Sequence, residues 1–265
     1  MYKTILFEVK DHIAKVSINR PHVQNALEAK NDMRTYQELH DVFTRCDKDP
    51  DIRAVVLTGV GKHFSAGGDI AEFKADIENG TYIPEYNVRI TGNMAAAIRH
   101  CRKPTIAMVN GTAAGAGMAV AMACDFRIMA TNSKLNPAFI RMGLSGDTGA
   151  MFNLAQCVGP TKALEYMMLG DPIGAEAAYQ CGLAYRVCEP EMLEEETNKL
   201  AARLAKGPTY AYGKQKELMY GSYYGGYEGY LNTEITYMRN CSLTEDFAEA
   251  VNAFLEKRKP EFAGK

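Results

Sequence analysis

The sequence predicts an α/β fold assembled from repeated strand–turn–helix units. Residues 54–58 form a short, nearly all-apolar run, as expected for a strand that is covered on both faces. A glycine-containing turn and a helix-like segment from Ile70 follow this run. The same order returns at residues 104–124, so we expect the two units to stack in one α/β core.

The flanking elements follow from hydrophobic periodicity. Residues 3–8 and 12–18 are predicted as two strands, because apolar residues alternate in the second. Residues 26–46 carry apolar side chains at a mostly helical period. The later chain predicts strands at 125–129 and 183–187, helices at 150–158, 161–169, 173–180, 192–204 and 244–258, and a long helical segment at 211–239.

The C-terminal part is expected to be helical. We therefore divide the chain into a core of residues 1–205 and a helical region of residues 206–265. Gly225 and Gly226 predict a bend within the long helical segment. Thr244 precedes the last helix and is predicted as its N-cap, because its hydroxyl can accept from first-turn N–H groups.

Four tyrosines in the long segment have helical spacing. They stand at positions 223, 227, 230 and 237. Such a stripe is typical of a helix that packs on the protein's own core. It could also face a partner subunit or line an acyl pocket, and both alternatives stay open.

Composition excludes several classes of partner. The chain has 265 residues and a formal net charge of −2, so it has no basic excess for nucleic acid or for an anionic membrane. Its 47% hydrophobic and 23% charged residues are typical of a soluble globular protein. No apolar run approaches the roughly 20 residues of a membrane span. We expect neither nucleic-acid nor membrane partners.

The cysteines and the N-terminus indicate a cytoplasmic location. Seven cysteines are scattered without a C-x-x-C pair, which is typical of reduced thiols in a cytosolic protein. Charged residues at positions 3, 8, 10 and 11 interrupt any apolar segment of a signal peptide. No His or Cys spacing is typical of a metal site, so no metal is expected.

The glycine-rich stretch at residues 109–125 is the first candidate for a site. Gly111, Gly115 and Gly117 stand between a β-branched run and a small apolar segment, where a strand turns into a helix. Unpaired N–H groups at such a helix start can bind an anion or a developing oxyanion. A dinucleotide fingerprint needs a third glycine where this chain has Val120. A carbonyl or oxyanion site and a simple tight turn both remain open.

Several short motifs lie in order along nearly the whole chain. They are N-R-P at 19–21, N-A-L at 25–27, H-F-S-A-G-G-D-I at 63–70, P-T-I-A-M-V-N-G at 104–111, A-G-A-G at 114–117, A-C-D at 123–125, G-L at 143–144, D-x-G at 147–149 and E-K-R-K-P-E-F at 256–262. In this order they resemble the crotonase (enoyl-CoA hydratase/isomerase) superfamily. The resemblance implies a spiral of ββα units and a C-terminal helical region used in trimerisation, with a homotrimer or a homohexamer as the assembly.

The resemblance also implies a coenzyme A thioester as the substrate, with no other cofactor. Two backbone N–H groups in that family grip the thioester carbonyl, and they correspond here to Gly68 and Ala116. Removal of a proton next to a thioester places negative charge on the carbonyl oxygen, and preorganised N–H donors stabilise that charge. Gly68 and Ala116 are therefore the candidate oxyanion hole.

The CoA contacts of the family carry over mainly as backbone contacts with adenine and ribose. The candidate residues are Gln24, Ala26, Leu27, Ala66, Asp69 and Ile70. Family members often carry a basic side chain where this chain has Gln24, so the phosphates must be bound partly elsewhere. Lys30, Lys74 and the C-terminal lysines of a neighbouring chain are the candidates for that role.

Two departures from the hydratase branch of the family change the expected chemistry. Hydratases use two glutamates as base and acid for the added water, and Ala119 and Ala138 stand at these positions. Neither alanine can transfer a proton, so hydration by paired carboxylates is not expected. Asp147 remains, at a position that other branches of the family use.

Three roles for Asp147 compete. It can cap a helix predicted from Thr148, it can carry a proton between Cα and Cγ of an enoyl-CoA, or it can be a covalent nucleophile as in the aryl-CoA dehalogenases. The dehalogenases pair the aspartate with a tryptophan and a histidine, whereas this chain has Phe139 and Gly92 there. The surrounding sequence, 138–144, resembles the isomerase branch and favours proton transfer. An apolar pocket would raise the pKa of the carboxyl for this task.

Other polar side chains are weaker candidates for the chemistry. Asp69 begins a helix and is predicted as its N-cap, and Glu72 lies one turn further on. His63 precedes the glycine turn and is predicted to be structural. Ser65 and Cys124 have neither the G-x-S-x-G elbow of a nucleophile nor a base nearby in sequence. Proton transfer is assigned to none of these five.

The favoured function is double-bond isomerisation of an enoyl-CoA through an enolate, with Asp147 as the proton-transferring base. One alternative is a hydratase or hydrolase that opens a ring or cleaves a C–C bond in a cyclic acyl-CoA. Another is a relative that binds acyl-CoA without turnover. A variable loop at residues 75–100 and the C-terminal helices are expected to form the walls of the acyl pocket.

Overall fold

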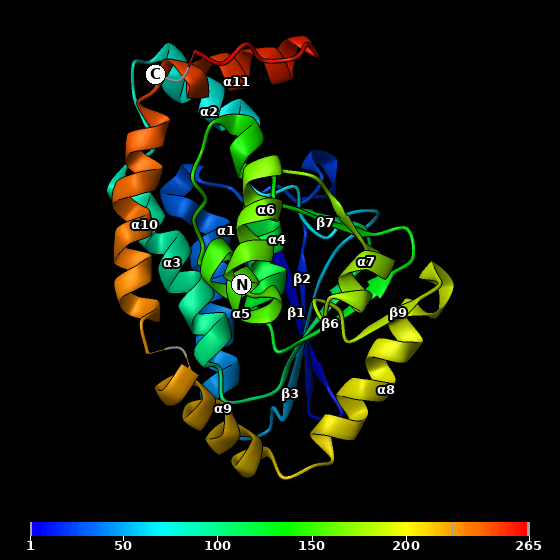
Figure 1. Cartoon of the computed structure of the whole chain (residues 1–265). Coiled ribbons are helices and arrows are strands. Elements are labelled where there is room, and N and C mark those ends of the chain that lie inside the picture. Colours follow the sequence, from blue (N-terminus) through cyan, green and yellow to red (C-terminus); the bar gives the residue numbers. More distant parts are fainter. Residues whose placement is uncertain (1, 224, 264–265) are drawn as a thin grey trace.

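A six-stranded sheet forms the centre of the molecule in this computed structural model, which describes residues 2–223 and 225–263 but not the side chains of residues 30–32, 222 and 223. Figure 1 shows the sheet between two groups of helices. Its order is β1 (Ile5–Lys10), β2 (Ile13–Ile18), β3 (Ala54–Gly59), β4 (Thr105–Val109), β6 (Phe126–Ala130) and β9 (Arg186–Cys188). Only the β1–β2 pair is antiparallel among these. The predicted α/β class is confirmed.

A second, smaller sheet lies beside the first. It has the order β5 (Thr112–Ala114), β7 (Lys134–Asn136) and β8 (Ile173–Gly174). Segments this short carry no hydrophobic period of their own, so the sequence did not predict them. β5 follows β4 directly and leads into α4 (Ala116–Ala123), so the small sheet positions the start of that helix.

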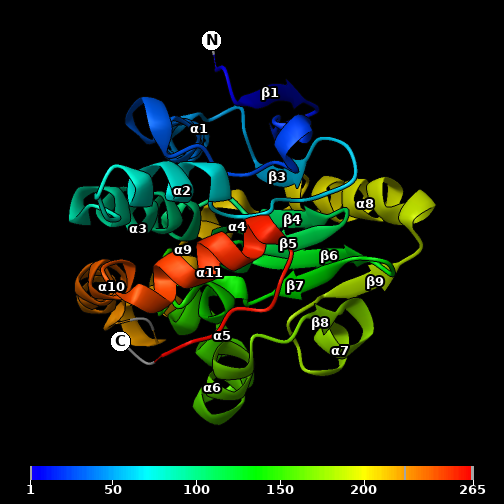
Figure 2. The ribbon, with the colours of Figure 1, turned by 90° about the horizontal axis from the view of Figure 1, so that it is seen from above.

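The helices cover both faces of the large sheet, so its inner strands are apolar throughout. All six residues of β3 are buried. On one side lie α1 (Lys30–Lys48), α3 (Glu85–His100) and α4, and on the other lies α8 (Leu193–Ala205), as Figure 2 shows. The remaining helices of the core are α2 (Ile70–Glu78), α5 (Ala150–Val158), α6 (Pro160–Leu169) and α7 (Ala175–Gln180). None of the helices described is long and apolar enough to cross a membrane.

The first long helix starts later than the periodicity predicted. It begins at Lys30 rather than at residue 26. Gln24 and Asn25 have φ angles of 56° and 58°, which a helix does not allow. Leu27 then donates its N–H to the Gly67 carbonyl at 2.7 Å. The prediction was wrong here because the apolar residues of an irregular turn have the same spacing as those of a first helical turn.

The expectation of a variable loop at residues 75–100 was also wrong. Most of this range is α3, which packs between α1 and α10 (Tyr227–Ser242). Two small buried residues, Ala95 and Gly92, allow close approach, and Gly92 faces Leu231 of α10. Residues 75–100, all of which the structure describes, line no part of the main cavity.

The C-terminal region consists of α9 (Thr209–Tyr223), α10 and α11 (Glu245–Glu256). The helical segment is interrupted before Tyr227, at the predicted glycines. Thr244 caps α11 as predicted, and its hydroxyl accepts from the Phe247 N–H at 3.1 Å. Figures 1 and 2 show α11 across the end of the molecule that carries α2. The boundary at residue 205 coincides with the end of α8 and stays a prediction.

The three predicted stripe tyrosines that lie on α10 do not share one environment. Tyr227 is buried, and its ring centroid lies 4.9 Å from that of Phe152. Tyr230 contacts the same ring at 5.3 Å, whereas Tyr237 is 59% exposed. The side chain of Tyr223 lies outside the described residues. Packing on the protein's own core therefore holds for the first half of α10, and no tyrosine of this helix lines the main cavity.

Candidate active site

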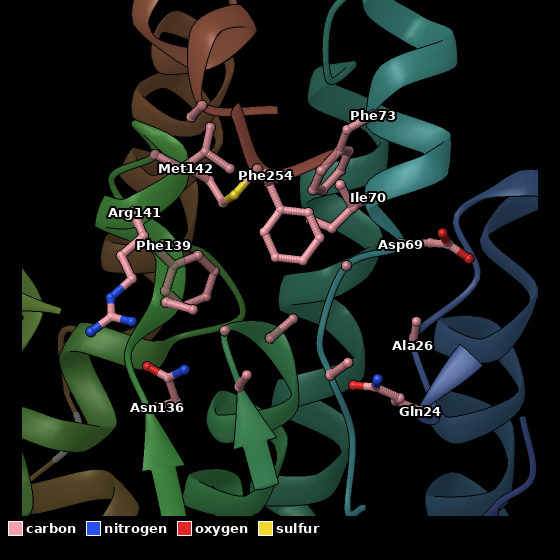
Figure 3. Close-up of a pocket in the computed structure, with 18 of the residues that line it drawn as sticks. Gln24, Ala26, Asp69, Ile70, Phe73, Asn136, Phe139, Arg141, Met142 and Phe254 are labelled. Carbon is pink, nitrogen blue, oxygen red and sulfur yellow. The ribbon is translucent and has the colours of Figure 1, made fainter. Parts of the chain in front are cut away.

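A cavity of about 710 Å³ lies between the start of α2 and the 3-10 helix η2 (Ala138–Met142). Figure 3 shows Gln24, Ala26 and Asp69 on one side and Asn136 and Arg141 on the other, with aromatic rings between them. Its apolar wall includes Ile70, Phe73, Phe139, Met142, Leu144, Met238, Ala250 and Phe254. The cavity is therefore large enough and apolar enough for an acyl group.

Two backbone turns meet on one wall of the cavity, and they carry Gly68 and Ala116. A Cβ added at Gly67 would lie 3.2 Å from the Ala116 nitrogen, so the turns are in contact. Ala116 is the first residue of α4, so its N–H has no acceptor within the helix. In the bridge between Leu27 and Gly68, the Leu27 N–H donates to the Gly67 carbonyl. The Gly68 N–H takes no part in this hydrogen bond.

Asp147 also lines the cavity, in the turn before α5. It is only 6% exposed, and burial raises the pKa of its carboxyl to about 6. The Thr148 hydroxyl donates to Oδ1 at 2.8 Å, and the Thr91 hydroxyl lies 3.4 Å from Oδ2. These two hydroxyls lower the pKa of Asp147 and so partly offset the effect of burial. Asp147 is therefore a carboxylate that can still accept a proton near neutral pH.

The helix-cap role of Asp147 is excluded by the local backbone. The helix α5 begins at Ala150, and its N-cap is Gly149, with no side-chain cap. Thr148 and Gly149 have φ angles of 60° and 70°, so the chain turns away between the carboxyl and the helix. Asp147 lines the cavity instead.

Sequence reasoning missed Glu234, which lies behind this turn. It is 6% exposed on α10, and its Oε2 accepts from the Gly149 N–H at 2.9 Å. Burial and the negative charge of Asp147 raise the pKa of Glu234 to about 8, against the effect of the Gly149 N–H. Glu234 does not line the cavity. No motif spacing connects residues separated by 85 positions, so only the tertiary structure could find this contact.

Tyr36 of α1 was also missed. It lines the cavity and is 4% exposed. Burial raises the pKa of its phenol well above the usual value, and the charges of Asp147, Glu72 and Asp69 raise it further. Its hydroxyl is therefore neutral and can act as a hydrogen-bond donor. In the sequence it is one apolar-period position of a helix, which gave no signal of a site.

Other carboxyls near the cavity have structural partners. Asp69 caps α2 as predicted, since it accepts from the Ala71 N–H at 3.2 Å, and it also lies 3.5 Å from the Arg20 guanidinium. Glu72 accepts from the Ala29 N–H at 2.9 Å and does not line the cavity. Both groups therefore hold the backbone around the cavity.

The positions at which hydratases carry glutamates are apolar here. Ala119 is fully buried in α4, and Ala138 lines the cavity at the start of η2. Neither provides a group that could activate water. The carboxyl of Asp147 thus stands without a second acid at either of these two positions.

The candidate CoA residues lie together with one exception. The cavity is lined by Gln24, Ala26, Ala66, Asp69 and Ile70. Leu27 is fully buried in the core and does not line the cavity. The Lys30 side chain lies outside the described residues, and Lys74 lies 3.6 Å from Glu78 on its own helix. Arg141 and Arg258, which were not predicted, are basic groups that line the cavity.

The candidate nucleophiles serve the fold. Ser65 is buried, and its hydroxyl donates to the Asn25 carbonyl at 2.8 Å. Cys124 is fully buried, and burial raises the pKa of its thiol to about 12. His63 lines the cavity, and its carbonyl accepts from the Asn25 amide. Within the described ranges, no group of three or more His, Cys, Asp or Glu could hold a metal ion.

Known proteins are similar to this chain in sequence over its whole length. A family model described as enoyl-CoA hydratase/isomerase matches residues 8–265. The trans-2-decenoyl-acyl-carrier-protein isomerase of Streptococcus mutans is 32% identical and covers 100% of this chain and 99% of its own. The 1,2-epoxyphenylacetyl-CoA isomerase of Escherichia coli is 31% identical, with 100% of both chains covered.

A solved structure of similar extent agrees with these matches. The crystal structure of an enoyl-CoA hydratase from Mycobacterium avium subsp. paratuberculosis has a TM-score of 0.89 and 27% identity, with 99% of this chain and 100% of that chain covered. The relatives thus include both isomerases and a hydratase. With its strand–turn–helix core and its cavity at two neighbouring turns, the chain belongs to the enoyl-CoA hydratase/isomerase family.

Proposed function

We propose that the protein moves the double bond of an enoyl-CoA, with Asp147 as the base that carries the proton. The observation that carries the proposal is the buried carboxyl of Asp147 in the cavity that Gly68 and Ala116 also line. The alanines at 119 and 138 support a reaction that needs one carboxylate rather than two.

The reaction follows from the charges in the cavity. Asp147 accepts a proton from Cα of a 3-enoyl thioester, and negative charge moves to the thioester oxygen. The N–H groups of Gly68 and Ala116 stabilise this enolate, because each has no acceptor in its own ladder or helix. Asp147 then returns the proton to Cγ, which gives the conjugated 2-enoyl thioester. No water or redox equivalent is consumed.

The nucleophile alternative finds less support. A covalent aspartate would need further groups at the positions of Phe139 and Gly92. Phe139 is part of the apolar wall, and Gly92 lies in α3, faces Leu231 of α10 and does not line the cavity. We therefore keep proton transfer as the role of Asp147.

The test is conversion of a 3-enoyl-CoA to the 2-enoyl-CoA by the purified protein, with an Asp147→Asn variant beside it. We expect the variant to lose about 10²-fold or more in kcat, the scale of general-base catalysis. Asp51→Asn serves as the matched control, because Asp51 is exposed and does not line the cavity. An undiminished rate in Asp147→Asn would contradict the proposed role.

Product masses separate the other candidates. Isomerisation leaves the mass unchanged, whereas hydration or hydrolytic ring opening adds one water. A protein that only binds acyl-CoA would bind the thioesters tightly and convert none. Because the Streptococcus mutans relative is named for an acyl-carrier-protein thioester, each acyl group should be offered on both carriers.

Assembly into a homotrimer or homohexamer is part of the proposal, with residues 206–265 as the contact region. Exposed large apolar side chains on α10, α11 and the turn between them support it: Tyr237, Leu243, Phe254 and Leu255. Light scattering after size-exclusion chromatography would give the mass directly. A monomer would contradict the assembly without affecting the proposed chemistry. Cytoplasmic location is likewise proposed, supported by the free thiols.

A further inference from the structure

The turn that carries Asp147 is held from behind by a second carboxyl. Glu234 lies on α10, 85 residues further along the chain, and its Oε2 accepts from the Gly149 N–H at 2.9 Å. Its Oε1 is fully enclosed and has no hydrogen-bond partner in the described part of the chain. A buried carboxylate oxygen without a donor is costly, whereas a protonated carboxyl at the same place avoids a buried charge.

The space around this turn leaves it little freedom. Gly149 has a φ of 70°, and a Cβ there would lie 2.4 Å from the Tyr227 hydroxyl. Thr148, with a φ of 60°, donates its hydroxyl to Asp147. The contact from Glu234 therefore holds the N–H directly after Thr148, a non-glycine residue in the left-handed region, and two residues after Asp147.

We propose that Glu234 is a positioning residue for Asp147: as a neutral carboxylic acid it holds the turn through the Gly149 N–H, and it leaves the single negative charge of the pair on Asp147. The inference rests on the proposed function of Asp147 as the base. Glu234 lies outside the cavity lining.

The charges that face Glu234 agree with this role. Asp147 is the acidic group that faces it from the turn, and Tyr227 and Tyr230 are the titratable groups on its own helix. Burial raises the pKa of both phenols, so they are neutral. Arg99 of α3 acts on Tyr227 rather than directly on Glu234. Burial and Asp147 raise the pKa of Glu234 to about 8, against the lowering effect of the Gly149 N–H and the Tyr230 hydroxyl, so Glu234 is protonated at pH 7 while Asp147 is ionised.

The kinetic test compares Glu234→Met, which keeps the length of the side chain but cannot accept the N–H, with Glu234→Gln, which can. We expect Glu234→Met to lose at least tenfold in kcat with KM changed less than threefold, because the substrate contacts remain. Glu234→Gln should recover most of that loss at pH 6 to 7. The same pair of substitutions at the exposed Glu228 of the same helix is the control.

Either of two kinetic results would overturn the inference. Glu234→Met with the kcat of the wild type would show that the contact does not position the base. Glu234→Gln as impaired as Glu234→Met would show that a negative charge, rather than a neutral acid, is required there.

A second readout does not depend on turnover. Because the folded pKa of Glu234 is raised, its contribution to stability is present below its ordinary pKa of 4.5 and is lost as the pH rises to about 8. The stability of Glu234→Gln relative to the wild type should therefore increase over this range. In an Asp147→Asn background the same step should end at a lower pH, since one negative neighbour is removed. If the step does not move, the coupling between Asp147 and Glu234 is contradicted, whether or not the protein has isomerase activity. If the step moves but the protein has no isomerase activity, the coupling holds and the missing activity contradicts only the proposed function.

Discussion

At the scale of single residues, burial decides which groups near the cavity are charged. Asp147 and Glu234 are both 6% exposed, and burial raises the pKa values of both, but to different levels, about 6 and about 8. The difference follows from their neighbours. The hydroxyls of Thr148 and Thr91 hold down the pKa of Asp147, whereas the negative charge of Asp147 raises the pKa of Glu234 further. Two acids in contact with one turn thus hold different protonation states at neutral pH.

This difference predicts how activity and stability depend on pH. Asp147 must be ionised to act as a base, so kcat/KM should rise with pH and reach half its plateau near pH 6. Stability should change in the opposite sense. The contribution of a carboxyl with a raised folded pKa is present below 3.8 and is lost as the pH rises through about 6.

Initial rates between pH 5 and 7.5 and denaturant unfolding over a wider range are the two measurements. Asp147→Asn should remove the acidic step from the stability curve. The stability of this variant relative to the wild type should rise by about 3 kcal/mol from the acidic end to the neutral end of the pH range. This figure corresponds to a shift of roughly two pKa units. A rate profile that is flat from pH 5 to 7.5 would contradict the assignment.

The glycine next to Ala116 predicts a second effect on catalysis. A Cβ at Gly117 would lie 2.5 Å from the Ser65 carbonyl oxygen, which belongs to the neighbouring strand bridge. Gly117→Ala must therefore push the two turns apart and displace the Ala116 N–H. We expect kcat to fall by at least about tenfold, since loss of one oxyanion donor costs about 10²–10³.

Gly174→Ala is the matched control for this variant. Nothing lies within 4 Å of a Cβ at that position, and Gly174 has an ordinary extended backbone. Both variants should be compared at equal folded fraction, measured by circular dichroism. Wild-type kcat in Gly117→Ala would show that the turn does not bind the carbonyl oxygen.

At the scale of elements, each group of the site depends on where a helix begins. Ala116 opens α4, Asp69 caps the start of α2, and Gly149 precedes α5. The starts of α2 and α4 meet at the cavity because the segments that lead into them are bridged at Ser65 and Ala113, and the turn before α5 brings Asp147 to the same cavity. Helix starts present unpaired N–H groups, so their convergence produces a site with donors for an anion.

The start of α11 gives a prediction at this scale. Thr244 is its N-cap, and the helix carries Ala250 and Phe254 to the cavity. Thr244→Ala should cost about 1 kcal/mol of stability, because the Phe247 N–H loses its acceptor. It should also raise KM more than it lowers kcat, since α11 forms a wall and not the catalytic turn.

Thr233→Ala is the control, because Thr233 is an exposed residue within α10 and its hydroxyl only donates to the Gly229 carbonyl of the preceding turn. Denaturant unfolding and steady-state kinetics of both variants check the prediction. Equal stabilities of the two variants would mean that the cap does not contribute.

At the scale of the whole molecule, apolar side chains form a large cluster between the sheet and α1, α3 and α4, and a smaller one under α8. The cavity lies at the edge of the large cluster, so its walls are continuous with the core. The segment that contains α11 closes this edge from outside (Figure 2). Because alternate residues of β3 belong to the two clusters, we expect both sides of the sheet to unfold together.

The cysteines report on this cooperativity. Cys46, Cys101 and Cys124 are at most 1% exposed, and burial raises the pKa values of their thiols to about 12, 11 and 12. We expect iodoacetamide to modify the exposed Cys157 in the native protein at pH 7.5, and the three buried thiols only after unfolding. Mass spectrometry of labelled peptides, with and without denaturant, measures this. Rapid labelling of Cys124 in the native state would show that the core opens locally.

Much of the fold could be predicted from the sequence, because the signals are local. The apolar run of β3, the glycine turn before α4 and the cap at Thr244 each depend on residues close in the chain. The start of α1 and the strands of the small sheet could not be predicted. Their hydrogen bonds go to partners far along the chain, such as the one from Leu27 to Gly67.

The sequence by itself determined the family, the absence of the paired glutamates and the choice of Asp147 as the candidate base, because each depends on residue identities in a fixed order. Only the tertiary structure decided the surroundings of that base. The burial of Asp147, the hydroxyl of Thr91 and the carboxyl of Glu234 come from segments that lie far apart in the chain. A pKa depends on which groups and how much water lie within a few ångströms in space, and the order of the residues does not contain this information.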